Sequence, residues 1–414
     1  MNVTQTGCQG AEALSAGSRT EKALRAGVLL GGAGFVAGLL WAPDRIWPAF
    51  LIAVTYLVHL GLAAAFFLAV QNTTKAGWSV LLRRVPEAMT ASLAWAALLV
   101  PMLLFGVHEL YSWTHEDAFT GAHAWMAGKK AWLNLPFFSV RTVLYFAAWL
   151  LPAALLVRNS RLQDDDGLII HTVRNRKVSA IFLFLFAITV SAASFDWLMS
   201  LEPEWYSTIF GAYVFAGLFL TGSAATTIVV ILLRRKGSFR KSKFCRFDHL
   251  GEIAPEESLI SPAHLHDLGK LVFAFSSFWA YLWFCQFMLI WYTNMPEESL
   301  YFARRMRGGW ETFFWINVAL NWVIPFFGLM SRTFKRDERI LLLVSLSVLL
   351  GHWVDLYVMV QPVFFDRPVL GLWELAPMCG VAALFLLTTF VRLRAVPLIP
   401  LRDPLVEESV LHRM

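Results

Sequence analysis

The distribution of apolar residues constrains this chain more than any other feature. Ten apolar runs of about 20 residues each have the length that a helix needs to cross the hydrocarbon core of a bilayer. They lie at residues 24–42, 47–71, 89–107, 134–157, 177–200, 207–233, 269–293, 309–330, 339–361 and 373–391. Only 15% of the residues are charged, against roughly 25% in soluble domains. The sequence therefore predicts an all-α, polytopic membrane protein with about ten transmembrane helices.

The Lys and Arg residues indicate how these spans are oriented. With the ten spans in place, 27 of the 35 Lys and Arg residues fall on one side, 7 on the other, and Arg141 inside a span. The side richer in Lys and Arg is normally cytoplasmic. We therefore expect both termini in the cytoplasm, with residues 1–23 a disordered tail, 234–268 a cytoplasmic loop and 392–414 a second tail. Because the charges are divided among short loops, a nucleic-acid partner is not expected.

One spacing occurs in two distant spans and indicates an internal repeat. Asp196 is followed seven positions later by Pro203, and Asp355 seven positions later by Pro362. Aligning these frames matches residues 47–200 with 207–361 as a parallel repeat of four helices each. Within this repeat, the start of the fourth span aligns with the start of the eighth through the pairs Phe137-Phe138 and Phe313-Phe314, which matches Arg141 with Asn317 and Tyr145 with Asn321. Two unrelated helices that end near a proline would give the same spacing, since proline is common there.

Ionisable side chains inside the spans are the candidate functional residues, because a charge in lipid is costly and is usually kept for function. The set comprises His59, Arg141, Asp196, His352 and Asp355. His352 and Asp355 share one helical face, and a carboxylate beside an imidazole can pass a proton. Arg141 has a depth suited to pairing with Asp196. These pairs would equally serve to fix helix packing, and His59 alone is typical of a hydrogen-bonded core histidine.

Redox centres and metals are not expected on this chain. The four cysteines are scattered, without the spacing of iron–sulfur, zinc or covalent haem sites. A two-haem membrane cytochrome needs four axial histidines, and only His59 and His352 lie within spans. Abundant aromatic residues are typical of packing and interfacial belts, and also suit a cleft for an amphipathic ring such as a quinone.

Three segments carry a resemblance to a known family. They are SFDWLMSLEPEWYSTIFGAYVFAG (194–217), HLHDLGKLVFAFSSFWAYLWFCQFMLIWYTNMPEES (264–299) and GHWVDLYVMVQP (351–362). Together they resemble the second large membrane subunit of alternative complex III, the ActF-type quinol:cytochrome c oxidoreductase subunit of the polysulfide-reductase-like (NrfD-like) membrane family. The resemblance is closest over the fifth to ninth spans. The N-terminal tail and the loop around 235–260 look idiosyncratic.

The resemblance implies a fold, partners and a location. The fold would be two four-helix bundles, at 47–200 and 207–361, flanked by peripheral helices at 24–42 and 373–391. The partners would be a sister ten-helix subunit, a periplasmic iron–sulfur protein, multihaem and monohaem cytochrome c subunits and small membrane subunits, in the bacterial cytoplasmic membrane. Haem and iron–sulfur clusters would lie on the partners. Quinol, as ubiquinol or menaquinol, is the expected substrate of the complex, and the sister subunit is the better candidate to bind it.

The expected function is therefore a subunit of a quinol-oxidising complex, without a redox centre of its own, that contributes a quinol-proximal or proton-conducting site. Whether such a chain counts as an enzyme stays open. One alternative is a secondary transporter, because duplicated bundles with buried charges also suit alternating access. The charges here lie off-centre, however, and the spans lack paired Gly/Pro breaks. A purely structural membrane anchor is the other alternative.

Overall fold

The computed structural model describes residues 19–115, 118–240, 257–400 and 402–413. Among the described residues, nine helical segments are long and apolar enough to cross a membrane, which confirms an all-α, multi-pass membrane fold. They are α1 (Arg19–Trp41), α2 (Pro43–Thr74), the segment Arg84–Leu110, α6 (Leu135–Asp166), α7 (Ile170–Trp197), α8 (Phe210–Arg235), α9 (Pro262–Thr293), α14 (Glu338–Val360) and α15 (Leu372–Arg394). Arg240 and Ser258 form an isolated antiparallel β-bridge.

The tenth predicted span, residues 309–330, is broken by an irregular turn. It consists of α11 (Trp310–Val318), a π-helical turn η9 (Ala319–Val323) and α12 (Ile324–Gly328). A π turn inserts a residue into the helix and is frequent at functional sites. Each regular piece is therefore too short to cross a membrane by itself, although the run as a whole lies where the sequence places it.

The third span also departs from regular α geometry. It is built from α3 (Arg84–Met89), α4 (Ser92–Leu99), the 3₁₀ helix η3 (Val100–Gly106) and α5 (Val107–Leu110). Side chains compete with the backbone at the first break, where Thr90 Oγ1 donates to the Glu87 carbonyl at 2.7 Å. Proline at 101 lacks an N–H and begins the 3₁₀ stretch.

The helices pack as two groups of four. α2, α4, α6 and α7 pack together, and so do α8, α9, α14 and the α11–η9–α12 run. The groups meet where α2 packs on α8. In the most apolar stretch of each of these helices, 94% of the residues of α2 and 89% of those of α8 are buried. Helices so enclosed contact protein rather than lipid on every side. The centre of the molecule is thus the first helix of each group.

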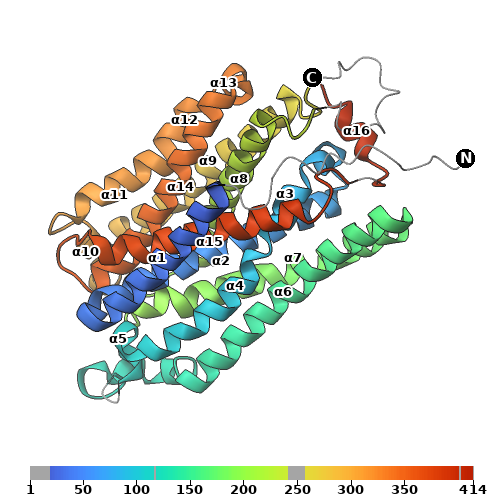
Figure 1. Cartoon of the computed structure of the whole chain (residues 1–414). Coiled ribbons are helices and arrows are strands. Elements are labelled where there is room, and N and C mark those ends of the chain that lie inside the picture. The colour runs from blue at the N-terminus through green and yellow to red at the C-terminus, as the bar shows by residue number, and fades with distance from the viewer. Residues whose placement is uncertain (1–18, 116–117, 241–256, 401, 414) are drawn as a thin grey trace, which may run out of the picture.

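α1 and α15 pack on each other outside the two groups, as Figure 1 shows. Glycines allow this contact: a Cβ at Gly31 would lie 2.3 Å from the Gly380 Cα, and one at Gly34 would lie 2.6 Å from the Ala376 Cβ. Small residues let membrane helices approach closely, and the packing energy then comes from dispersion contacts between backbones. The contact places α1 at the periphery, where α15 joins it to α2.

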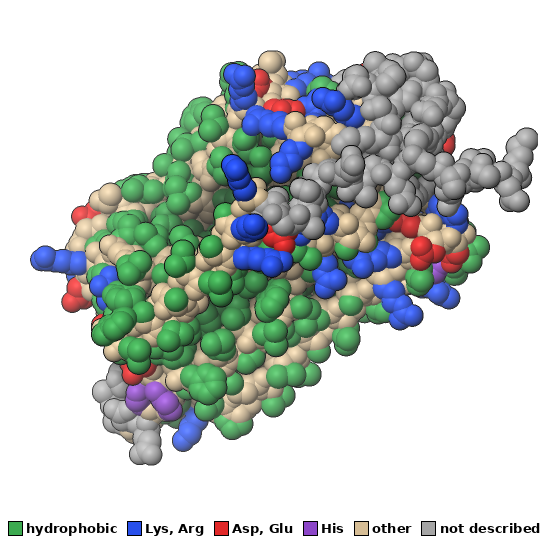
Figure 2. Space-filling model, in the orientation of Figure 1, with side chains coloured by type: hydrophobic (Ala, Val, Ile, Leu, Met, Phe, Trp, Pro, Cys, Tyr) green, Lys and Arg blue, Asp and Glu red, His purple; other side chains and the backbone are tan. Residues whose placement is uncertain are grey.

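The two ends of the molecule differ in charge. We call the end that carries α13 (Arg332–Arg336) and α16 (Val406–Val410) the inner end, and the end that carries α5 and α10 (Pro296–Arg305) the outer end (Figure 1). Figure 2 shows Lys and Arg gathered toward the inner end and hydrophobic side chains over the middle of the same face. This distribution is the one expected for a protein that crosses a bilayer.

The predicted C-terminal tail packs against the inner ends of both groups. Ser409 Oγ donates to the Trp78 carbonyl at 2.7 Å, in the connection between α2 and α3. Ser261 Oγ, just before α9, donates to the His412 carbonyl at 2.7 Å. His412 Nε2 lies 2.7 Å from Asp267 Oδ2 in α9. The segment 402–413 therefore joins the inner connections of the first group to the first turn of α9.

The predicted boundaries of the N-terminal tail and of the long inner loop differ from the structure by several residues. The helix α1 begins at Arg19, within the tail predicted for residues 1–23, and residues 1–18 lie outside the described part. The helix α9 begins at Pro262, within the loop predicted for 234–268, and residues 241–256 of that loop are not described. Ser261 and His264 form a capping box there, which satisfies the free N–H groups of the first turn.

Close contact of α1 with α15 predicts that Gly31→Val separates them. Cysteines at 27 and 383 should form a disulfide, because a Cβ at Gly27 would lie 3.0 Å from the Ala383 Cβ. Gly31→Val should sharply lower the yield of this cross-link on oxidation in membranes, as read by gel mobility. Gly32→Val is the matched control, since a Cβ there meets nothing within 4 Å. An unchanged yield with Gly31→Val would contradict the packing described.

Candidate functional site

Asp196 in α7 is fully buried (0% exposed) and is held by a fixed set of donors. Arg141 of α6 donates from Nε to Oδ2 at 2.7 Å and from Nη2 to Oδ1 at 2.8 Å. Tyr145 Oη donates to Oδ2 at 2.7 Å, and Trp132 Nε1 donates to Oδ1 at 2.8 Å. A bidentate arginine neutralises the carboxylate and fixes its orientation. The structure thus contains the predicted Arg141–Asp196 pair, in a form suited to joining α6 to α7.

Asp355 in α14 is equally buried (1% exposed), but its surroundings are different. Tyr213 Oη of α8 and Asn317 Nδ2 of α11 donate to Oδ1, the second at 2.8 Å. Trp279 Nε1 of α9 donates to Oδ2 at 3.3 Å. All three donors are neutral side chains, and no Lys or Arg donates to Asp355 within the described residues. A carboxylate without a fixed counter-charge is free to exchange a proton.

The two acid clusters occupy equivalent places in the two helix groups. The repeat alignment matches Arg141 with Asn317, and each donates to the aspartate of its own group. It also matches Tyr145 with Asn321, and Asn321 Nδ2 donates to Asn317 Oδ1 at 2.6 Å. Asn321 lies in the π turn η9, where its Cγ is 2.9 Å from the Cβ position of Gly351. The second cluster therefore has an amide pair where the first has an arginine and a tyrosine.

Two histidines connect Asp355 to the other helix group. His59 Nδ1 of α2 lies 2.8 Å from His352 Nε2 of α14, and both rings are buried. His352 Nδ1 lies 3.8 Å from Asp355 Oδ2 and has no hydrogen-bond partner within the described part of the chain. Gly217 of α8 leaves room here, because a Cβ would lie 3.1 Å from His352 Cε1. The groups His59, His352, Asp355 and Tyr213 thus form one buried series.

The geometry of this series allows a proton to cross His352. One hydrogen lies between two neutral imidazoles, so either His59 Nδ1 or His352 Nε2 donates. If His59 donates, the proton of neutral His352 is on Nδ1, facing Asp355. If His352 donates, its Nδ1 is an acceptor facing Asp355. A change of tautomer therefore transfers a proton between the His59 side and the Asp355 side, which is the chemistry of a proton shuttle.

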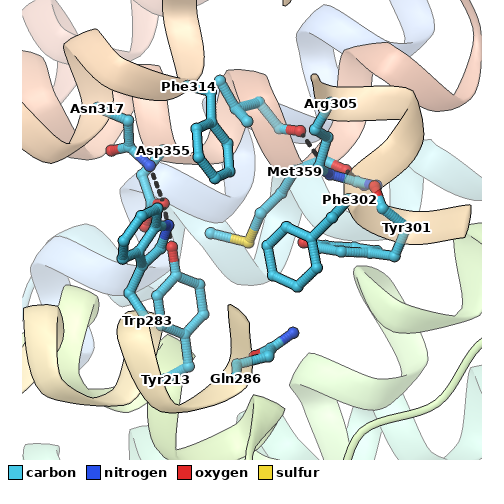
Figure 3. A pocket seen from close by; sticks show the side chains of 11 residues that line it. Tyr213, Trp283, Gln286, Tyr301, Phe302, Arg305, Phe314, Asn317, Asp355 and Met359 are labelled. Atoms are coloured by element: carbon cyan, nitrogen blue, oxygen red, sulfur yellow. Dashed lines mark hydrogen bonds between the residues drawn. The ribbon is translucent and has the colours of Figure 1, made fainter. Parts of the chain in front are cut away.

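A small pocket with a cavity volume of about 20 Å³ lies beside Asp355, which is room for about one water molecule. Figure 3 shows Asp355, Asn317 and Tyr213 on one side of it and Arg305 and Met359 on the other. Aromatic rings form much of the wall, and the polar lining also includes Gln286. The lining residues are Tyr213, Trp283, Gln286, Tyr301, Phe302, Arg305, Phe314, Asn317, Asp355, Val358 and Met359. Polar groups of this number can hold ordered water in a buried cavity.

A second pocket lies at the other end of the series, beside His59. Its cavity volume is about 20 Å³, and α2, α6, α7 and α8 provide its lining. Apolar side chains dominate it, with Thr55 and Ser194 as hydroxyl groups beside the imidazole. The buried series therefore runs from a pocket in the contact between the two helix groups to a pocket inside the second group.

Sequence reasoning missed several residues of this site. Tyr213 and Trp279 are neutral, and nothing in an apolar run marks which neutral polar residue faces an acid on another helix. Asn317 was matched with Arg141 but was not identified as a donor to Asp355. Arg305 counted only as an outer-loop charge, yet its side chain is 2% exposed. It donates to Glu202 Oε1 at 3.0 Å and to the carbonyls of Val358 and Met359. The Asp–Pro frame was a usable signal, because Glu202 directly precedes Pro203.

Outer-rim charges pair as well. Arg45 of α2 donates through two nitrogens to Glu374 of α15, at 2.9 and 2.8 Å, and the Glu374 side chain is 1% exposed. Burial lowers the pKa of Lys129 in the outer loop, where it donates to the Pro203 carbonyl at 2.5 Å. Within the described residues, no three His, Cys, Asp or Glu side chains are grouped to hold a metal ion.

Fold and site together define the class of protein. It is a multi-pass, all-α membrane protein of two packed four-helix groups, with a buried acid in each and a histidine pair between them. Comparison with known proteins adds no narrower class: no family model matches the sequence, and no match is found among curated proteins.

The different environments of the two aspartates predict different costs of substitution. Arg141→Met leaves the Asp196 carboxylate buried without its counter-charge, so the free energy of unfolding should fall by about 3–5 kcal/mol. Asn317→Leu removes a neutral donor to Asp355 and should cost about 1–3 kcal/mol. Urea titration in detergent, followed by circular dichroism, measures both. Equal losses in the two variants would contradict the assignment of Asp196 to a fixed ion pair.

Proposed function

We propose that this chain is an integral subunit of a quinol-oxidising electron-transfer complex, of the alternative complex III type, and that it conducts protons without a redox centre of its own. The observation that carries this proposal is the buried series His59, His352, Asp355 and Tyr213. Oxidation of a quinol releases two protons for every two electrons. A subunit beside the site of oxidation then needs groups that take up protons away from bulk water.

The neutral hydrogen-bond donors around Asp355 favour a proton-transfer role over a packing role for this residue. Packing alone is served well by the arrangement at Asp196, where a fixed arginine balances the charge. At Asp355 the equivalent position is an asparagine, and an imidazole with an unpaired nitrogen lies 3.8 Å away. Leaving a carboxylate without a counter-charge in a membrane interior is costly. Such a cost is retained where the group must change its protonation state.

The pocket beside Asp355 supports a role in moving protons rather than in holding quinol. It has room for about one water molecule, and Tyr213, Asn317 and Asp355 offer groups that hydrogen-bond that water. The sequence resemblance makes the sister subunit the better candidate to bind quinol at the electron-accepting clusters. The role proposed for this chain is therefore to move protons near that reaction, with quinone or menaquinone as the substrate of the whole complex.

Location and partners follow from the same proposal. The chain would lie in the bacterial cytoplasmic membrane with both termini in the cytoplasm. Its partners would be a sister ten-helix subunit, a periplasmic iron–sulfur protein, multihaem and monohaem cytochrome c subunits and small membrane subunits. Many Lys and Arg residues at the inner end support this orientation (Figure 2).

Asp355→Asn should slow proton release coupled to quinol oxidation, because an amide has the carboxylate's size but takes up no proton at neutral pH. The purified complex in vesicles, with an external pH indicator and a soluble electron acceptor, measures proton release and turnover together. We expect a loss of about 10²-fold in the coupled rate, the lower range for removal of a general acid–base group. Glu109→Gln, an exposed change at the outer rim, is the control. Unchanged turnover and proton release in Asp355→Asn would reduce the site to packing.

Purification tests the proposed assembly directly. An affinity tag on this chain should recover haem-bearing and iron–sulfur-bearing partners from mildly solubilised membranes, visible in optical and electron paramagnetic resonance spectra. A secondary transporter, the main alternative, would be recovered alone and would bind its substrate without partners. Recovery of a single colourless chain that retains its fold would contradict membership of an electron-transfer complex.

A further inference from the structure

A large hollow opens at the outer end, between loops of the two helix groups. Its cavity volume is about 630 Å³. Carboxylates are frequent in its lining: Glu109, Glu202, Glu204 and Glu297, with Arg304 as a cation. Contributions come from α5 and the turn after α7 in the first group, and from α10 and the end of α14 in the second. The hollow is wide enough to be filled with water.

Two side-chain contacts separate this hollow from the pocket beside Asp355. Glu202, which lines the hollow, accepts a hydrogen bond at 3.0 Å from Arg305, which lines the pocket. Trp205, which lines the hollow, stacks at 4.0 Å between ring centroids on Tyr301, which lines the pocket. One member of each pair thus faces each cavity. We call these two contacts the outer wall.

The outer wall is fixed on the pocket side. Arg305 donates to the carbonyls of Val358 at 3.0 Å, Met359 at 2.7 Å and Tyr301 at 2.8 Å, and its guanidinium lies 3.4 Å from the centre of the Tyr301 ring. These bonds hold the guanidinium at the outer end of α14, one turn beyond Asp355. Glu202 is held by Arg305 and by the more distant Arg304, at 3.8 Å, and is 8% exposed.

We propose that Glu202 is the outer proton outlet of the Asp355 pocket, and that its contact with Arg305 is the barrier between the pocket and the outer hollow. The proposal rests on the proposed function, since a proton must first reach Asp355. Glu202 first separates from Arg305, because a carboxylate paired with a cation holds a proton poorly. The proton then leaves the Asp355 carboxyl group, crosses the pocket on water beside Gln286 and Asn317, and is accepted by the Glu202 carboxylate. Glu202 then gives it to water in the hollow. No electron moves in these steps.

This arrangement explains why Arg305 is so extensively bonded to the backbone. A cation that followed Glu202 toward the hollow would leave the pocket open to solvent continuously. Because three carbonyls hold Arg305, displacement of Glu202 separates the pair without moving the guanidinium. An ion pair that only joined the two helix groups would need no cavity beside it. The Glu202–Arg305 pair has the outer hollow on one side and the Asp355 pocket on the other.

The barrier is tested first without any activity measurement. In a chain whose four native cysteines are replaced by serine, Gln286→Cys places a thiol in the Asp355 pocket. The purified complex in detergent is treated with a cationic, water-soluble methanethiosulfonate reagent, and modification is followed by mass spectrometry. With the wall intact, modification should be slow. Adding Glu202→Ala should speed it about tenfold, because it lowers the free energy of local opening of the wall.

Glu297→Gln is the matched control for the labelling, because Glu297 lines the hollow but is no part of the outer wall. It should leave the modification rate unchanged. A rate with Glu202→Ala equal to that with Glu297→Gln would overturn the barrier. Rapid modification in the chain with an intact wall would overturn it as well. Circular dichroism and recovery of partners confirm that Glu202→Ala has folded, and Glu202→Gln provides a milder replacement if it has not.

The outlet is tested by proton release from vesicles. Glu202→Gln retains the side-chain size and an acceptor for Arg305 but carries no proton, and it should slow proton release about tenfold, to a plateau independent of external pH. Glu297→Gln should leave release unchanged. If Glu202→Gln releases protons normally while Asp355→Asn does not, the outlet proposal fails and the proposed function stands. If neither substitution changes release, the proposed function itself fails, and the labelling result still decides whether the barrier exists.

Discussion

The requirement that polar groups within a bilayer find partners inside the protein governs this molecule. Lipid offers no hydrogen bonds to a buried acid, so each one must be bonded from within the protein, here by side chains from other helices. Asp196 draws donors from α6 and the loop before it, and Asp355 draws them from α8, α9 and α11. The positions of six helices in the two groups are thereby tied to the positions of two carboxylates.

The two helix groups satisfy this requirement in different ways. In the first, an arginine cancels the charge and leaves a rigid joint. In the second, amides, a phenol and an indole bond the acid without cancelling its charge, and the π turn at η9 brings Asn321 against Gly351 of α14. The two groups therefore hold a buried acid in two ways, by an ion pair in the first and by neutral donors in the second. Histidines from α2 and α14 connect the second frame to the centre of the molecule.

Much of this organisation could be predicted from the sequence. Apolar length located the spans, and the Asp–Pro spacing located both buried acids. The paired phenylalanines at the starts of the fourth and eighth spans matched Arg141 with Asn317. Direct contact between His59 and His352 could not be predicted, because it depends on how α2 crosses α14. Glu202 and Arg305 were missed for a related reason: a charged residue next to a span looks solvated in sequence, and only the fold shows that two loops bury it. The π turn at η9, which contains no proline or glycine, likewise carries no mark in the sequence.

The pairing of α1 with α15 has a consequence for how the protein is assembled in the membrane. Membrane helices enter the bilayer in order of synthesis, so α1 is released long before its partner exists. Until α15 arrives, the glycine face around Gly31 and Gly34 is exposed to lipid, and it offers little surface for other contacts. Completion of the outer layer is thus among the last events of biogenesis, and insertion factors that shelter a single glycine-rich helix would have the most time to act on this one.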